Sequence, residues 1–573
     1  MVADTYVGED KVVFAFDIGT TQTAVAFVHL QDGGFPHVRS VTKWPGQEEA
    51  SGDSKLPTLV AYNNAQTVAY GAEALESAAT EGLAKWFKLH LHPASMRTNS
   101  GASFEIPPLP RGVTLKQVYS HFMRYIYGHS TTFFKGHCID GPTIWDRLKD
   151  RVEIVLAIPN GWDLVQQSFL REAIVLAGVL PAGHDSKRLR FVSEAEASVH
   201  FGLAHTGGEQ WLKPGMKFCV IDAGGSTVDT TLYKCAAVTP KLELEEVTAS
   251  DCVQAGSVFV DRNAENMLRI KLKSSRFSDD DYIKSIIEVF ERKTKRKFDG
   301  SSDASVIAFG RASDNDPEVN ISKGRITMTS GEVAMAFQTP IYDIAESFQH
   351  VLERANGDCQ SLLLVGGFAD SPFLRQVLRE KNEQRGMATI SVDDGTKKAA
   401  AEGAVLWYIR QTVVARVCRS HFGTRTNRDF VPTDSRHKER ASEAYKGANG
   451  DMRIGPCFSP WCAKNEVVRN AEPRTFSYTK RWAADTDIDA RLRKALDFPV
   501  IAVDLDEAPY WTSESKAKTN RLLPGVRHVC SIKADLSGLR GSLKKKRSDT
   551  GEEYYSLHYK CPFTSVRLPS ALS

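Results

Sequence analysis

Two short stretches, far apart in the chain, share one layout, and this repeat constrains the fold more than any other feature. Residues 14–28 read FAFDIGTTQTAVAFV, and residues 218–233 read FCVIDAGGSTVDTTLY. In each, an apolar run leads into an aspartate, a turn of glycine and hydroxyl residues follows, and a second apolar run closes the unit. Both stretches predict a strand, a tight turn and a strand. Two such hairpins indicate a duplicated architecture.

The residues at each turn have a defined chemistry. Asp17 precedes the first turn and Asp222 precedes the second. Backbone N–H groups and hydroxyls in a glycine-rich turn can meet phosphate oxygens, and a neighbouring carboxylate can hold a hydrated Mg²⁺. One such hairpin is weak evidence, because many antiparallel hairpins carry an Asp and a Gly. The pair favours a nucleotide clamped between two halves.

A third glycine signal follows later in the chain. Residues 361–372 read SLLLVGGFADSP, an apolar strand followed by Gly366-Gly367 and a helix start with Ser and Pro. Backbone without side chains at such a turn can lie flat against an adenine or a ribose.

Strand and helix patterns alternate through most of the chain. Residues 56–62 and 152–158 predict strands, and residues 70–79, 114–127, 163–177, 260–272 and 279–298 predict helices. This alternation predicts an α/β fold with mixed sheets. From about residue 413 the character changes: residues 420–475 predict loops and short strands, and residues 500–505, 526–533 and 554–559 predict strands. The tail is predicted to be a separate β-rich domain.

Composition excludes some classes of protein. The net charge of +3 over 573 residues gives no argument for a nucleic acid or membrane partner, so we expect neither. There is no apolar run of membrane-spanning length and no signal-peptide pattern at the acidic start. The ten cysteines are scattered without zinc-site spacing, which favours reduced, buried thiols in a cytoplasmic protein.

In order and spacing, these stretches resemble the actin-like ATPase superfamily, and within it the seventy-kilodalton heat-shock chaperone family. The matching stretches are FDIGTT at 16–21, IPN at 158–160, VSEAEAS at 192–198, IDAGGSTVD at 221–229 and LVGGF at 364–368. Together they cover roughly residues 11–415. The resemblance implies a duplicated two-lobed ATPase with ATP or ADP and Mg²⁺ in a cleft, followed by a β-rich segment.

The resemblance also implies a role for each matching residue. Asp17 and Asp222 would hold Mg²⁺ through waters, Glu194 would orient or activate the attacking water, and Asp229 would support that network. The phosphates would be cradled by the two turns, whose residues are Gly19, Thr20, Thr21, Gln22, Gly224, Gly225, Ser226 and Thr227. The adenosine would contact Gly366, Gly367 and Phe368. Positioning and charge neutralisation of this kind are what phosphoryl transfer needs.

Three assignments leave alternatives open. The family places a lysine near the γ-phosphate, and Lys88 is at about the right position, with Lys85 as its competitor. The family also holds adenosine with a Glu and basic residues on one helix, where Glu291 matches and either Lys295 or Arg296 fits. Gly256 resembles the family's glycine beside the nucleotide, although a plain turn explains it equally well.

The chain departs from the family pattern in several places. Ser226 stands where a third glycine is usual, and Lys397-Lys398 stand where an acidic pair is common. No acidic-leucine linker follows the ATPase region, and the tail lacks a recognisable peptide-binding sandwich with a helical lid. We therefore predict a divergent branch with a disordered segment at 1–10, lobes at 11–212 and 213–412, the last helix of the second lobe returning to the first, and a β-rich domain at 413–573.

The sequence favours an ATP-binding, slowly hydrolysing, chaperone-like protein with client proteins or co-chaperones as partners. A sugar-type kinase of the same superfamily and a nucleotide-gated scaffold without significant hydrolysis are the alternatives. Other features have ordinary explanations: His90 and His92 are too few for a metal site, and Lys544–Arg547 reads as a solvated hairpin tip.

Overall fold

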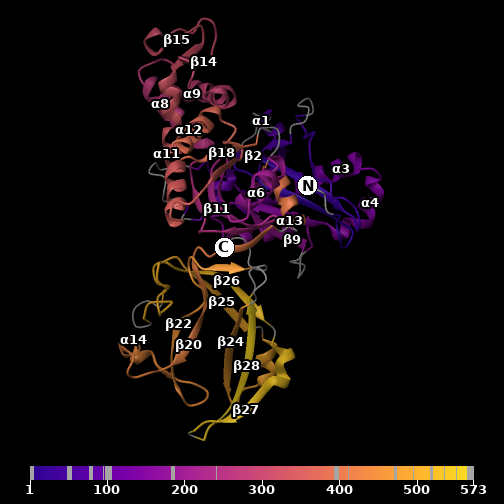
Figure 1. Cartoon of the computed structure of the whole chain (residues 1–573), viewed down its shortest axis with the longest axis vertical. Coiled ribbons are helices and arrows are strands. Elements are labelled where there is room, and N and C mark those ends of the chain that lie inside the picture. The colour runs from indigo at the N-terminus through magenta and orange to yellow at the C-terminus, as the bar shows by residue number, and fades with distance from the viewer. Residues whose placement is uncertain are drawn as a thin grey trace. The chain divides into compact units, whose positions relative to one another are not determined.

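The computed structural model divides the chain into two compact units, residues 1–162 with 166–413, and residues 163–165 with 414–573. Figure 1 shows the first unit with its helices and mixed sheets, and the second with mostly strands. The structure describes residues 5–47, 54–76, 82–93, 96, 106–181, 188–239, 242–392, 399–410, 412–469, 474–494, 496–515, 521–534, 536–549 and 551–563.

The first sheet of the first unit has the strand order β3-β2-β1-β8-β9, and β4 also pairs with β2. β1 and β2 form the first predicted hairpin, and β1, β8 and β9 run parallel. The strands are β1 Lys11–Ile18, β2 Gln22–Leu30, β3 Arg39–Ser40, β4 Lys55–Pro57, β8 Glu153–Ile158 and β9 Leu189–Ser193. The central strands are apolar and buried on both faces, as expected for a covered parallel sheet.

The second sheet repeats this order within the first unit as β12-β11-β10-β17-β18, and β13 also pairs with β11. β10 and β11 are antiparallel, whereas β10, β17 and β18 are parallel. The strands are β10 Lys217–Ala223, β11 Val228–Ala237, β12 Glu243–Glu246, β13 Asp251–Val253, β17 Ser361–Val365 and β18 Ala388–Ser391. The prediction of a mixed α/β fold is confirmed, and both predicted hairpins form.

Two smaller sheets and several helices complete the first unit. The sheets are β6-β5-β7 (Gln66–Tyr70, Leu59–Asn63, Gly82–Lys85) and β14-β16-β15 (Ala304–Ala308, Arg325–Thr329, Ile321–Ser322). The longer helices are α3 Leu115–His137, α4 Gly141–Leu148, α5 Leu164–Leu176, α6 Glu194–His205, α8 Ser257–Lys271, α9 Asp280–Val289, α11 Ser330–Arg354, α12 Pro372–Glu383 and α13 Ala399–Arg410. The short ones are α1 Glu73–Glu76, η1 Phe87–Leu91, η2 Lys149–Arg151, α7 Gly208–Trp211, η4 Phe290–Thr294, α10 Lys295–Lys297 and η5 Pro317–Val319.

Helix α13 joins the two sheets. Its small apolar side chains pack in one cluster with Val13, Ala15 and Ala24 of the first hairpin. It also crosses α6 closely, because a methyl group at Gly403 would clash with the carbonyl oxygen of Ala197. Only a glycine allows two helix backbones to approach so closely, so this crossing fixes α6, which carries Glu194.

The second unit consists of β-sheets with short helices. One sheet has the order β21-β22-β20-β25-β26, another has the order β24-β28-β27, and β19 pairs with β23. The strands are β19 Val413–Val417, β20 His421–Asp429, β21 Tyr445–Lys446, β22 Met452–Cys462, β23 Val467–Arg469, β24 Arg474–Ala483, β25 Leu496–Val503, β26 Val526–Ala534, β27 Leu543–Arg547 and β28 Glu553–Phe563. The helices are α14 Ser435–Glu439, η6 Ala441–Glu443, α15 Ile488–Arg493 and η7 Ser537–Ser542.

Several local predictions were wrong. Residues 420–475 contain the long strands β20 and β22 rather than loops and short strands, because the pairing of these two strands outweighs the weak strand preference of their Arg, Asn and Gly residues. Residues 544–547 belong to the edge strand β27, and the hairpin tip lies beyond them.

Other elements differ in extent from the prediction. Thr58 separates the predicted strand 56–62 into β4 and β5, which pair in different sheets. The helix predicted at 70–79 is described only as α1, with residues 77–79 outside the described part. The helix predicted at 279–298 contains the π-helical turn η4. In the segment predicted to be disordered, the Tyr6 N–H donates to the Gly34 carbonyl and Asp10 contacts the ring of His29.

Candidate functional site

The two hairpins deliver one buried aspartate each. Asp17 lies near the end of β1, opposite Ala24 of β2, and is 3% exposed. Asp222 lies near the end of β10, opposite Asp229 of β11, and is 7% exposed. The residues that precede the aspartate in each strand are mostly apolar and buried. Because the strand is buried, its aspartate carboxylate is buried as well.

The glycine turns of the two hairpins meet. A methyl group on Gly225 would lie 2.8 Å from Thr21 Oγ1, so the second turn lies close against the Thr21 side chain of the first. The third turn also packs here: Gly366 has a φ of +96°, and a methyl group on it would clash with Asp222 Oδ1. The Phe368 N–H donates to the Ala223 carbonyl over 2.7 Å. The three glycine signals of the sequence thus converge on one place.

A buried ion pair stands beside the aspartates. Lys88 Nζ in η1 donates to Glu194 Oε1 over 2.6 Å, and the two side chains are 5% and 13% exposed. Ser193 caps α6 by accepting from the Glu196 N–H, which places Glu194 in the first helical turn. Burial lowers the pKa of Lys88, but the carboxylates of Glu194, Asp17 and Asp229 outweigh it and raise the pKa above its usual value. Lys88 therefore stays cationic.

Several carboxyl groups gather at the site. Burial raises the pKa of Asp222 well above its usual value, and the charges of Glu194, Asp229 and Asp17 add to the rise. A hydrogen bond from Ser198 Oγ to Asp222 Oδ2, 2.5 Å long, opposes it. Four carboxyl groups thus influence one another, and Lys88 lies beside them. A gathering of carboxyl groups of this kind fits a hydrated cation.

Asn160 links the first sheet to the second. It follows β8, its backbone N–H donates to Asp229 Oδ1 over 3.2 Å, and its side-chain amide donates to Thr231 Oγ1 over 3.2 Å. Both bonds are buried, so each one holds Asp229 or its strand in a fixed position relative to β8.

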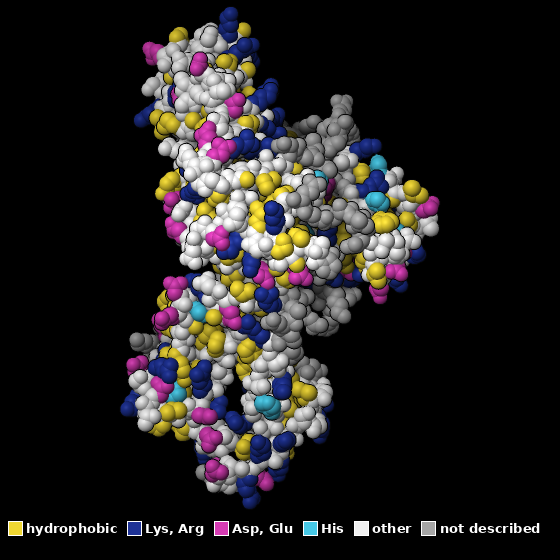
Figure 2. All heavy atoms as spheres, in the orientation of Figure 1, with side chains coloured by type: hydrophobic (Ala, Val, Ile, Leu, Met, Phe, Trp, Pro, Cys, Tyr) yellow, Lys and Arg dark blue, Asp and Glu magenta, His cyan; other side chains and the backbone are white. Residues whose placement is uncertain are grey.

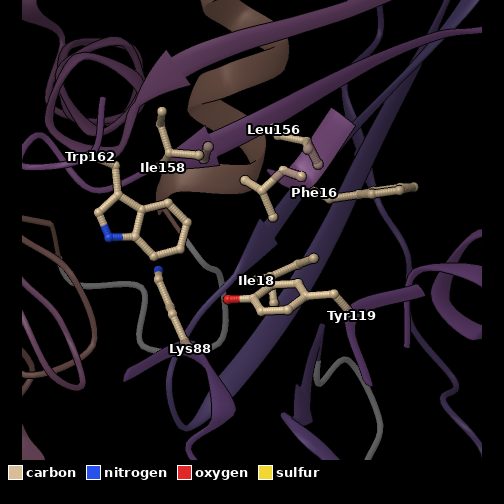
Figure 3. A pocket seen from close by; sticks show the side chains of 9 residues that line it. Phe16, Ile18, Lys88, Tyr119, Leu156, Ile158 and Trp162 are labelled. Carbon is tan, nitrogen blue, oxygen red and sulfur yellow. The ribbon is translucent and has the colours of Figure 1, made fainter. Parts of the chain in front are cut away.

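Aromatic side chains line the other side of Lys88. Figure 3 shows Lys88 Nζ pointing toward the ring of Trp162, and the distance to the ring centroid is 5.6 Å. The Trp162 N–H is bonded to His92 Nδ1 over 2.8 Å. A cavity of about 10 Å³ lies here, and its lining includes the Tyr119 side chain and the apolar side chains of Phe16 and Ile18. The Tyr119 hydroxyl is buried and has no hydrogen-bond partner in the described structure.

The turns offer donors that fit a phosphate. Thr20, Ser226 and Thr227 are each buried, and Ser226 Oγ finds no hydrogen-bond partner among the described residues. An orphaned hydroxyl at the meeting point of two glycine turns is the group that a phosphate oxygen would satisfy. Within the described residues there is no cluster of three or more His, Cys, Asp or Glu side chains that could hold a metal by protein ligands alone. Asp17 and Asp222 fit a Mg²⁺ that keeps most of its waters and phosphate ligands.

Helix α8 begins against the second turn. The backbone N–H groups of Gly256, Ser257 and Val258 donate to the carbonyls of Ser226, Gly224 and Gly225. A methyl group on Gly256 would clash with the backbone of Gly225 and Ser226, so this glycine is required by packing.

Lys295 is also tied to α8. Its Nζ donates to Asp261 Oδ2 over 2.5 Å and to the Ser257 carbonyl over 3.3 Å, whereas Arg296 is exposed. Burial raises the pKa of Asp261 to about 7; the charge of Lys295 opposes the rise, and that of Glu291 adds to it.

The sequence-predicted residues are therefore distributed as follows. Asp17, Lys88, Glu194, Asp222 and Asp229 lie in one cluster, with the turns of residues 19–22 and 224–227 beside it. Phe368 is different: its ring is buried in the core against Phe337, so only its backbone is near the second hairpin. Lys397-Lys398 lie outside the described residues.

Sequence reasoning missed four contributors. Ser198, Tyr119, Trp162 and His92 bear on the cluster only through tertiary contacts. Ser198 had one usable signal, since it is one helical turn after Glu194 and lies within a matching stretch. The other three had none.

A scan against protein-family models found no match. Curated relatives do match. The chain is 23% identical to human heat shock 70 kDa protein 12B over 514 residues, which is 74% of this chain and 72% of that protein. It is 22% identical to mouse heat shock 70 kDa protein 12A, over 70% of each chain, and to the human form, over 72% of each. The chain thus resembles seventy-kilodalton heat-shock proteins, at low identity, over most of its length. The resemblance expected from the hairpins is thus confirmed by comparison of most of the chain.

None of the described helices is long and apolar enough to span a membrane.

Proposed function

We propose that this heat-shock-like protein binds ATP with Mg²⁺ and hydrolyses it slowly, as a chaperone-like protein with an actin-like, two-lobed ATPase unit. The observation that carries the proposal is the meeting of the two glycine turns beside four carboxyl groups, three of them buried, and one buried lysine. The repeated strand order of the two sheets supports a duplicated fold, with lobes at 11–212 and 213–412. The names of the matched relatives point the same way.

The turns would hold the phosphates. The phosphate oxygens would meet backbone N–H groups of residues 19–22 and 225–227 and the hydroxyls of Thr20, Thr21, Ser226 and Thr227, whereas the Gly224 N–H is bonded to the Thr227 carbonyl. Asp17 and Asp222 would hold the hydrated Mg²⁺, which when bound supplies positive charge to the phosphate oxygens. Asp17 comes from the first sheet and Asp222 from the second, so the proposed metal site needs both sheets.

Glu194 would accept the proton of the attacking water. Its carboxylate is oriented by Lys88, whose ammonium would also meet the transferring phosphoryl group. Asp229 would support this network. Its carboxylate is held in place by the buried backbone N–H of Asn160, which donates to Asp229 Oδ1. The contribution of the protein is positioning and charge, which accounts for most of the catalysis of phosphoryl transfer.

The adenosine would lie along Gly366-Gly367 on one side and Glu291 and Lys295 on the other. Gly367 has open space where a side chain would be, so its backbone is accessible to a planar base. Lys295 is the buried candidate of the basic pair, and Gly256 keeps α8 close to the phosphate turn. Client proteins or co-chaperones are the partners that such an ATPase would serve.

The test is a single-turnover assay of the full chain with Mg²⁺ and γ-labelled ATP. We expect slow release of inorganic phosphate that requires no acceptor, and a loss of about 100-fold or more in Glu194→Gln. Transfer of the label to an added sugar would instead indicate the kinase. Tight ATP binding without turnover would indicate the scaffold, and an absence of ATP binding would contradict the proposal altogether.

A further inference from the structure

The net charge of the chain conceals a strong asymmetry. Residues 414–573 contain 29 Lys or Arg and 19 Asp or Glu, a formal charge of +10. Residues 1–413 contain 44 Lys or Arg and 51 Asp or Glu, a formal charge of −7. The near-neutral total that argued against a polyanionic partner is therefore the sum of two unlike parts.

The sheet β24-β28-β27 of the second unit has one face on a core and one face outside. Trp482, Leu543, Leu557 and Tyr559 lie on the inner face, in one cluster with Leu492 of α15 and Leu536. Side chains alternate along a strand, and directly paired residues share a face. The register therefore assigns every other residue of the three strands to the outer face.

The outer face carries a group of cations. Lys544 and Arg481 both pair with Ser556 of the central strand, Lys546 pairs with Tyr554, and Lys560 pairs with Ser477. Lys544, Lys546 and Lys560 are exposed and Arg481 is partly exposed. Along β27 the two lysines are about 6.8 Å apart, and Arg481 lies about 9.5 Å across the sheet from Lys544. Figure 2 shows Lys and Arg side chains, with Asp and Glu side chains among them, over the part of this unit where Figure 1 labels β27 and β28.

These four cations have no ion-pair partner among the described residues. Lys545, between two of them in the sequence, points to the inner face, and its Nζ contacts Glu553 Oε2 over 2.7 Å. No Asp or Glu occupies an outer-face position in the described parts of the three strands. In the described strands the outer face thus carries four cations and no acidic residue, whereas on the inner face Lys545 is paired with Glu553.

Hydroxyls and rings are among the remaining outer-face residues. Ser477 and Thr479 provide exposed hydroxyls, Tyr554 provides a partly exposed ring, and His558 is exposed and bonded to Thr479 Oγ1 over 3.2 Å. Lysines and hydroxyls on a sheet face contact phosphate oxygens, and rings on such a face stack on unpaired bases.

From this arrangement we propose that the outer face of β24-β28-β27 binds single-stranded nucleic acid. An acidic peptide fits less well, because a peptide strand pairs with a sheet edge and places its side chains in pockets. The face is also without an apolar ridge of the kind that inserts into a membrane. The proposal is independent of the ATP site, because all of its residues lie in the second unit.

The test is fluorescence anisotropy of a labelled oligouridylate of about 12 nucleotides, within the site size of single-strand-binding domains. The full chain is titrated in excess Mg-ADP from about 0.05 to 0.3 M salt. Four phosphate contacts predict a slope of about −3 in log affinity against log salt. The variant Arg481→Gln/Lys544→Gln/Lys546→Gln/Lys560→Gln should lose affinity by roughly 100-fold or more at 0.1 M salt and most of the slope.

The matched control is Lys545→Gln, which removes one lysine from the same strand but from the inner face. We expect its affinity to stay within about twofold of the wild type, and Tyr554→Leu to weaken binding by roughly 5- to 100-fold through lost stacking. The proposal is overturned if the wild type does not bind, if Lys545→Gln weakens binding as much as the quadruple variant, or if oligoglutamate or anionic vesicles compete better than unlabelled oligouridylate. Thermal melting of each variant identifies any that fails to fold.

Discussion

The two units use charge in opposite ways. In the first unit, the charged groups that matter are buried: Lys88 and Glu194 form a pair with little exposure, and Asp17 and Asp222 lie at the ends of apolar strands. In the second unit, the unpaired cations of β24, β27 and β28 are at the surface. Buried charges interact strongly and depend on their partners, whereas exposed charges are screened by water and salt. Substitutions in the first unit should therefore change stability, and those on the outer face of the second should not.

The largest effect is expected at Lys88. Lys88→Ala removes the cation that is paired with Glu194, and breaking a buried ion pair from one side costs about 3–5 kcal/mol of unfolding free energy. Lys85→Ala is the matched control, since Lys85 is exposed and its Nζ lies 4.5 Å from the centroid of the Trp86 ring; we expect it to cost under about 1 kcal/mol. Urea denaturation of both variants measures the difference. Equal costs would mean that Lys88 is not the buried cation of this site.

A change of opposite sign is expected at Asp222. Because its pKa is raised, the folded state holds this proton more tightly than the unfolded state, so the unfolding free energy of the ligand-free protein falls as the pH rises from 3.8 through the folded value. Asp222→Asn keeps an acceptor for Ser198 and removes the charge, so at pH 7 it should stabilise the ligand-free protein by about 1–3 kcal/mol.

The check is the difference in unfolding free energy between wild type and Asp222→Asn measured at several pH values. The difference should grow from acidic to neutral pH. A variant that is less stable than wild type at pH 7 would show that this carboxylate is already compensated in the ligand-free protein.

A smaller gain is expected from Tyr119→Phe. The Tyr119 hydroxyl is buried without a partner, and removing an unsatisfied polar group should raise the unfolding free energy by about 1 kcal/mol. Tyr125→Phe is a less informative comparison, because Tyr125 has further interactions. Calorimetric melting resolves a change of this size; destabilisation by Tyr119→Phe would indicate that the hydroxyl is hydrogen-bonded in solution.

The smallest effect is expected on the cationic face. Lys544→Gln and Lys546→Gln remove exposed charges without ion pairs, so the unfolding free energy should stay within about 0.5 kcal/mol of the wild type. Chemical denaturation at low and high salt measures this. A loss of more than 1 kcal/mol would place these side chains in a structural network and weaken the contrast between the units.

Much of the first unit could be predicted because local pattern and burial agree there. The apolar runs before Asp17 and Asp222 are fully buried strands, and the Ser193 cap starts α6 where the sequence placed it. The second unit was harder, because β20 and β24 carry polar and basic residues on long paired strands. Their strand structure comes from cross-strand pairing, which a single sequence does not display.

For the candidate site, sequence could propose the residues but not their contacts. The sequence alone left both Lys88 and Lys85 as candidates for the lysine near the phosphate. The fold distinguishes them, because Lys88 is buried and Lys85 is exposed. For Phe368, the motif predicted a contact with adenosine but could not say which atoms would make it. In the structure its ring packs in the core against Phe337. Charge summed over the whole chain was also misleading, because it averaged an acidic unit with a basic one.

The most direct test of the central claim is titration calorimetry of Mg-ATP with the wild type and with Asp17→Asn/Asp222→Asn. The two aspartates lie on different hairpins, so the double variant removes both carboxylates proposed to hold the metal. The account predicts that the wild type binds and that the double variant, folded by circular dichroism, shows no measurable binding. Unchanged affinity in the double variant would contradict it.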